Sequence, residues 1–155
     1  MALDPTPVLS QIRKTLEDPS GDPDAEALRR IRAILDEPAL FAQISEYLQR
    51  GNDPDVKAKI VTDIIAILRH CSDRSAHRKN ELTNVRYGIA GGTAMVAGGL
   101  IAFSAGSVLV LGVIIGGALV VLNCLSRTGV LSAEEQIYAD IAARAAKIRE
   151  RFDAT

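Results

Sequence analysis

The side chains with the most obvious chemical potential gather near residue 70. His70, Cys71, Asp73 and His77 are all residue types that bind metals. Their order, H-C-x-D-x-x-x-H, lacks the C-x-x-C or H-x-x-x-H spacing that places two ligands on one helix face, so a site would need further ligands from elsewhere. We interpret the group as the solvated end of a helix. Cys71 and Cys124 are the only cysteines, and we expect both to be reduced thiols.

Other patterns typical of catalysis or metal binding do not occur in the chain. The two histidines leave no partner for a triad, and neither a Gly-rich phosphate loop nor a G-x-S-x-G motif is found. The acidic stretch DPSGDPDAE, from Asp18 to Glu26, lacks the alternating acids, the glycine at its sixth position and the final glutamate of a calcium loop. We therefore expect no enzyme activity, no cofactor and no metal site.

A block without any charged residue fills positions 87–126, between Arg86 and Arg127. About 20 apolar residues cross a bilayer core, so the block fits two short arms better than one helix. The small and polar residues near its middle favour a turn there. The sequence thus predicts a hydrophobic hairpin of two short transmembrane helices, whose tip contains Ser104, Gly106 and Ser107.

The two arms of this hairpin differ in composition. The first, from Gly88 to Phe103, has few strongly apolar residues, and its apolar drive for insertion is small; the second, from Val108 to Leu125, has about twice that drive and is the main predicted span. Nine of the twelve glycines lie in the block, where they weaken helices unless close packing compensates for them. Two GxxxG motifs and a seven-residue repeat predict helix packing, within the hairpin or between copies, although GxxxG also arises by chance in such segments. The predicted packing residues are Gly88, Gly92, Gly99, Gly112 and Gly116.

Positive residues flank both ends of the block, and its predicted tip carries none. These flanks are Arg78, Lys79 and Arg86 before it and Arg127 after it. Since basic residues stay on the cytoplasmic side, both ends are expected in the cytoplasm, giving a multi-pass membrane protein. The same cations are candidates for contact with anionic lipid.

The region before the block, residues 1–86, has helical periodicity punctuated by acidic-Pro pairs that each predict a helix start. Three apolar stripes precede a fourth, wider one between Pro54 and about Cys71. After the block, residues 127–155 predict an amphipathic helix that begins with Ser132 and Glu135 as a capping box. Asp140 and Arg144 have the i,i+4 spacing of an ion pair on that helix.

Composition and charge leave three functions in competition, all on an all-α fold. The first is a membrane protein whose hairpin inserts and self-associates, with the cytoplasmic helices as a module that binds a protein partner. The second is a membrane-permeabilising protein stored in soluble form; its uncharged hairpin beside amphipathic helices is similar in architecture to pore-forming colicins. The third is a soluble bundle with the apolar arms inside. The net charge of −1 argues against nucleic acid as a partner.

Overall fold

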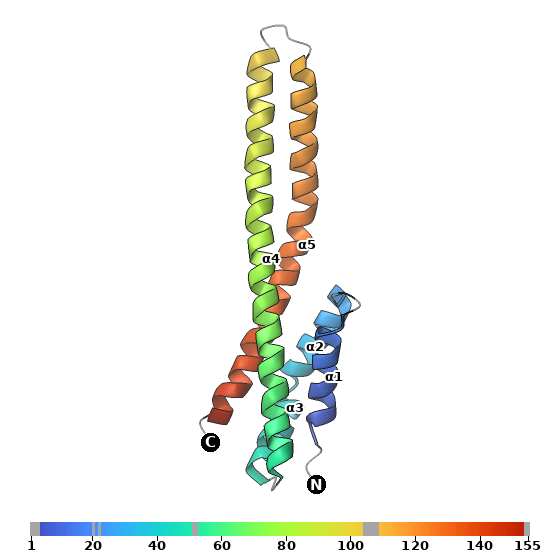
Figure 1. Cartoon of the computed structure of the whole chain (residues 1–155), viewed down its shortest axis with the longest axis vertical. Coiled ribbons are helices and arrows are strands. Elements are labelled where there is room, and N and C mark those ends of the chain that lie inside the picture. Colours follow the sequence, from blue (N-terminus) through green and yellow to red (C-terminus); the bar gives the residue numbers. More distant parts are fainter. Residues whose placement is uncertain (1–3, 20, 22, 51–52, 104–108, 154–155) are drawn as a thin grey trace. The chain divides into compact units, whose positions relative to one another are not determined.

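The computed structural model describes residues 4–19, 21, 23–50, 53–103 and 109–153. The described residues are 92% helical and contain no strand, so the all-α class is confirmed. Figure 1 shows the helices in chain order. They are α1 (Thr6–Leu16), α2 (Ala25–Asp36), α3 (Pro38–Arg50), α4 (Pro54–Phe103) and α5 (Leu109–Asp153).

The chain forms two compact units. Unit 1 consists of Met1–Ser75 and Gln136–Thr155, and unit 2 is the continuous segment Ala76–Glu135. Both α4 and α5 contribute to each unit, because they extend across the boundaries. The charge-free block lies inside unit 2. This unit also contains the helical segments 76–86 and 127–135, which carry charged residues on either side of the block.

Unit 1 has a conventional hydrophobic core. Its stripes recur at helical spacing, so each helix buries one face and leaves the other in water. The side chains of Leu9, Ile60 and Ile141 are each 0% exposed, which places residues far apart in the sequence in one core. The wider core also contains Ile12, Leu16, Leu28, Ile31, Leu35, Leu40, Ile44, Ile64, Ile67, Tyr138 and Ile148.

Helix starts follow the acidic-Pro signals only in part. Helices α3 and α4 begin at Pro38 and Pro54, and Asp53 accepts a hydrogen bond from the amide of Asp55 at 3.0 Å. No helix begins at Pro19, which lies in a turn. Helix α2 is capped by Asp24, whose carboxylate accepts a 2.6 Å bond from the amide of Ala27. The Asp18-Pro19 prediction is therefore wrong, because the acid that reaches the free amides of α2 lies farther along the chain.

The two long helices correct two predicted boundaries. The sequence predicts a helix end near Cys71 and a new start at Ser132, yet α4 runs to Phe103 and α5 contains Ser132 in its interior. All six prolines lie at or before Pro54, so no proline interrupts a helix after that residue. A change from apolar to charged side chains alters the surroundings that suit a helix, but it leaves the backbone hydrogen bonds of the helix intact.

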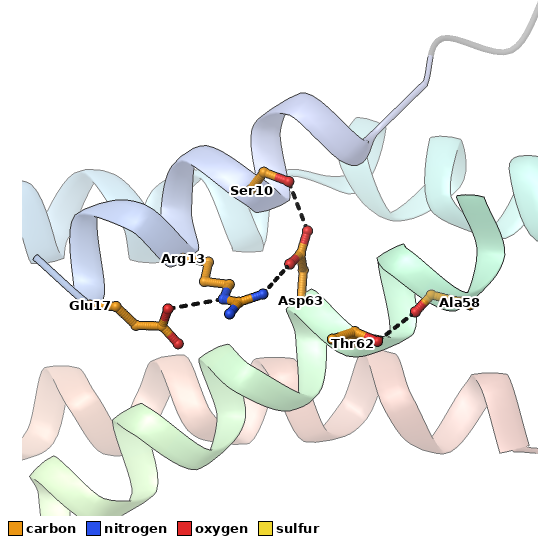
Figure 2. Close-up of polar contacts among 6 residues, drawn as sticks. All are labelled: Ser10, Arg13, Glu17, Ala58, Thr62 and Asp63. Atoms are coloured by element: carbon orange, nitrogen blue, oxygen red, sulfur yellow. Dashed lines mark hydrogen bonds and ion pairs between the residues drawn. The ribbon is translucent and has the colours of Figure 1, made fainter. Parts of the chain in front are cut away.

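A buried carboxylate joins α1 to α4. Asp63 on α4 is 3% exposed, although most carboxylates stay in water unless they are paired. Figure 2 shows Ser10 and Arg13 of α1 pointing toward it: the Ser10 hydroxyl donates to Oδ2 at 2.8 Å, and Arg13 Nη1 donates to Oδ1 at 3.1 Å. Arg13 also donates from Nε to Glu17 at 3.0 Å. These bonds raise the pKa of Arg13, so its charge is fixed.

Two ion pairs set the register of α5 against α2. Arg32 lies 3.1 Å from Asp140, and one turn farther along both helices Asp36 contacts Arg144. The sequence predicts an ion pair between Asp140 and Arg144 within α5; each instead contacts a residue of α2. Because these side chains are partly exposed, each pair contributes little stability, but the alternation of sign disfavours a shifted register.

Candidate functional site

Unit 2 contains a close contact between α4 and α5, which lie side by side in Figure 1. A Cβ atom placed on Gly88 would lie 2.8 Å from Sγ of Cys124, and one on Gly99 would lie 2.5 Å from Cγ1 of Ile114. The partners descend in number on α5 as the glycines ascend on α4. The two helices therefore run antiparallel, with glycines of α4 forming the contact surface.

Near the middle of the contact the two backbones themselves meet. A Cβ on Gly92 would lie 2.9 Å from the carbonyl oxygen of Gly117, and one on Gly117 would lie 2.8 Å from the carbonyl oxygen of Gly92. Real Cβ atoms do not approach other atoms this closely. The absence of side chains thus lets the backbones approach, which multiplies dispersion contacts and compensates for the low helix propensity of glycine.

We call the α4–α5 contact through Gly88, Gly92, Gly99 and Gly117 the seam. A regular sequence pattern distinguishes most of the glycines that form it. Three Gly-Gly doublets occur, at 91–92, 98–99 and 116–117. In each, the second glycine is buried in the seam, whereas a Cβ atom on the first would meet no described atom within 4 Å. Sequence reasoning missed Gly117, because the GxxxG motif selects Gly116, and the doublets are the signal that could have identified it.

The second GxxxG motif lies outside the seam. Gly112 and Gly116 are exposed, and a Cβ on either would meet nothing within 4 Å. Within one chain they therefore pack against no described atom. Their use in contacts between copies stays a prediction. The predicted tip residues Ser104, Gly106 and Ser107 lie outside the described residues.

The positive flanks divide into one paired and several exposed cations. Arg78 of α4 is held by two carboxylates: Nη1 lies 2.7 Å from Glu81, and Nε lies 3.0 Å from Glu134 on α5. The hydrogen bond from Arg78 is the main reason that the pKa of Glu81 falls below its usual range. The predicted flank residues Lys79, Arg86 and Arg127 are exposed.

Most of the apolar surface of unit 2 lies outside the seam. Among the described residues, one helical segment, Gly112–Glu150 of α5, is by length and composition apolar enough to cross a membrane, and 6% of its apolar window is buried. The first arm, in α4, does not reach the same apolarity, as its glycine content predicts. Where the structure describes side chains of the block, the large exposed apolar residues are Tyr87, Met95, Leu100, Ile101, Val113, Ile115, Leu119, Val120, Leu122 and Leu125.

The residues near position 70 do not converge. Cys71 is fully buried in the core of unit 1, and this burial raises the pKa of its thiol to about 12. Asp73 and His77 are exposed, and the His77 ring lies 3.4 Å from Glu81. Among the described residues, no group of three or more His, Cys, Asp or Glu side chains is placed to hold a metal ion.

Comparisons with protein-family models, with curated proteins and with solved structures find no match to this chain. The described residues define an all-α protein, and one helix among them is by length and composition apolar enough to span a membrane.

Proposed function

We propose that this chain is a small helical membrane protein whose charge-free antiparallel pair inserts into the bilayer. In this proposal both arms of the block cross the membrane, and residues before Arg86 and after Arg127 stay in the cytoplasm. Copies associate through Gly112 and Gly116, two exposed glycines of α5. The helices of unit 1 form an interaction or assembly module for a protein partner.

The observation that carries this proposal is the exposure of the apolar block. A core helix of a soluble protein is mostly buried, whereas 6% of the apolar window of α5 is buried. An apolar surface of this extent is unfavourable in water and favourable against lipid chains. The same observation does not favour the soluble bundle, in which both arms would be covered.

The seam supports the insertion of both arms together. Taken alone, the first arm has little apolar drive, but it packs backbone to backbone against the second. In a bilayer such contacts between small residues are a main source of helix association. The second arm can therefore carry the first into the membrane.

Fractionation followed by cysteine labelling tests the proposal. The expected protein resists extraction by alkaline carbonate. With both native cysteines changed to Ala, Lys79→Cys and Ser132→Cys should react with an impermeant maleimide from the same side. Labelling from opposite sides would show a single span and contradict the two-span topology.

Two other outcomes correspond to the competing functions. A soluble monomer that releases dye from vesicles would support the permeabilising, colicin-like function instead. A soluble monomer that melts cooperatively without lipid and leaves vesicles intact would support the soluble bundle. Either outcome would overturn constitutive membrane residence.

A further inference from the structure

A groove of about 510 Å³ lies between α4 and α5 inside unit 2. Its volume is in the range of sites for small molecules. It begins at the end of the charge-free block, because Ser126 and Arg127 both line it. The lining residues that matter for recognition are Arg78, Glu81, Val85, Arg127, Val130 and Glu134.

Charges of both signs line this groove in equal number. Arg78 is shared by Glu81 and Glu134, so this trio carries one more negative charge than positive. Arg127 is exposed and supplies the balancing positive charge; its field also lowers the pKa of Glu81. The groove is therefore neutral overall, with Arg127 directly after the charge-free block and the two carboxylates farther from the block along α4 and α5.

The groove also has an apolar part. Val130 lies outside the charge-free block, among charged residues, and this aliphatic side chain is 60% exposed. Val85 lies just before the block on α4. An exposed aliphatic side chain beside ionic groups suits the bilayer interface, where the glycerol region of a lipid joins its charged headgroup.

We propose that this groove binds the headgroup of an amine-bearing zwitterionic phospholipid of the phosphatidylethanolamine type. The lipid phosphate pairs with the Arg127 guanidinium, and its primary ammonium lies toward Glu81 and Glu134. A purely anionic headgroup would meet the same two carboxylates and be repelled. A choline headgroup has no N–H to donate to them. The inference rests on the proposed membrane location.

Lipid titration in detergent, followed by native mass spectrometry, tests this preference. The probes are phosphatidylethanolamine, phosphatidylcholine and phosphatidylglycerol with identical acyl chains. We expect the ethanolamine lipid to bind at least roughly fivefold more tightly than the other two, as the loss of a charge-assisted hydrogen bond implies. Glu81→Gln should narrow the difference between the ethanolamine and glycerol lipids.

A matched pair of arginine variants locates the effect. Arg127→Gln should remove most of the preference for the ethanolamine lipid. Arg86→Gln removes the same charge from the residue that precedes the block, which does not line the groove, and should leave the preference intact. Circular dichroism of each variant checks that the helices persist.

Three results would overturn the proposal in distinguishable ways. Equal binding of all three lipids, with membrane association retained, would refute headgroup recognition and leave the proposed function standing. Equal effects of Arg86→Gln and Arg127→Gln would reduce the preference to general flank electrostatics. A protein that stays out of vesicles of all three compositions would refute both the membrane location and the groove.

Discussion

The backbones of Gly92 and Gly117 meet directly across the contact between α4 and α5. A Cβ on either residue would lie within 2.9 Å of the carbonyl oxygen of the other. The obstacle is backbone, which cannot rotate away as a side chain can. This relationship fixes the register of the antiparallel pair. It also means that adding a side chain should have different effects on stability at neighbouring glycines, which substitutions can measure.

Gly92→Ala should destabilise the helix pair, and Gly91→Ala should not. The added methyl at 92 overpacks the seam and costs about 1–3 kcal/mol of the free energy of unfolding. The methyl at 91 meets open space, so the higher helix propensity of alanine should stabilise by up to about 1 kcal/mol. Unfolding by SDS in mixed micelles, followed by circular dichroism, measures both. Equal destabilisation would show that the seam is wrongly placed.

Changing Gly112 and Gly116 together to Ile should weaken association between copies while leaving the helix pair intact. A Cβ atom at either position meets no described atom of the same chain within 4 Å, so we expect the added bulk to act mainly on contacts with another molecule. Cross-linking and sedimentation in detergent report the association. Gly92→Ile is the control that should disrupt the pair itself. If cross-linking is unchanged in the double variant, the outward glycines form no contact face.

An aspartate within the block should act according to its depth. Gly98→Asp places a charge in the weakly apolar first arm at a position where a Cβ atom meets no described atom within 4 Å, so we expect the charge rather than a steric clash to dominate its effect. A charge at membrane depth costs from about 2.5 kcal/mol upward, whereas near an interface the cost approaches zero. We expect Gly98→Asp and Gly99→Asp to block insertion and Gly106→Asp to be mild. Equal partitioning of all three into membranes would mean that the turn is not at Ser104–Ser107.

Asp63→Asn should destabilise unit 1 far more than Glu17→Gln. Both acids bind Arg13, but Asp63 is buried and Glu17 is exposed. Loss of the buried charge should cost about 1–3 kcal/mol of the free energy of unfolding, because Arg13 is partly exposed and can regain water. Loss of the exposed pair should cost at most about 0.5 kcal/mol. Urea unfolding measures the difference, and similar values would show that burial of Asp63 contributes nothing.

The buried thiol of Cys71 should make unit 1 less stable at alkaline pH. Its pKa is raised from 9.0 to about 12, so above pH 9 the unfolded chain loses a proton that the folded chain keeps. Stability then falls with rising pH, by up to about 1.4 kcal/mol per pH unit between these values. Unfolding at pH 8 and pH 10 should show a steeper loss for the natural chain than for Cys71→Ala. Parallel losses in the two proteins would contradict this prediction.

Several features of the fold could be predicted from local sequence. Apolar stripes at helical spacing gave the all-α class, because a helix buries one face wherever it packs. The absence of proline after Pro54 can also be read from the sequence alone. It is a sufficient reason to predict that α4 and α5 continue past Cys71 and Ser132. The composition of the two arms likewise indicated that the second is the more apolar, and α5 is the helix long and apolar enough to span a membrane.

The tertiary structure decided which residues meet. Local spacing suggested that Asp140 would pair with Arg144, but their partners are Arg32 and Asp36 on another helix. Motif spacing selected Gly116, while the rotation of α5 about its axis turns Gly117 toward Gly92. Neither Ser10 nor Arg13 signals the buried Asp63 some fifty positions away. Periodicity determines that a helix has a packing face, but the partner helix determines which few atoms on that face make contact.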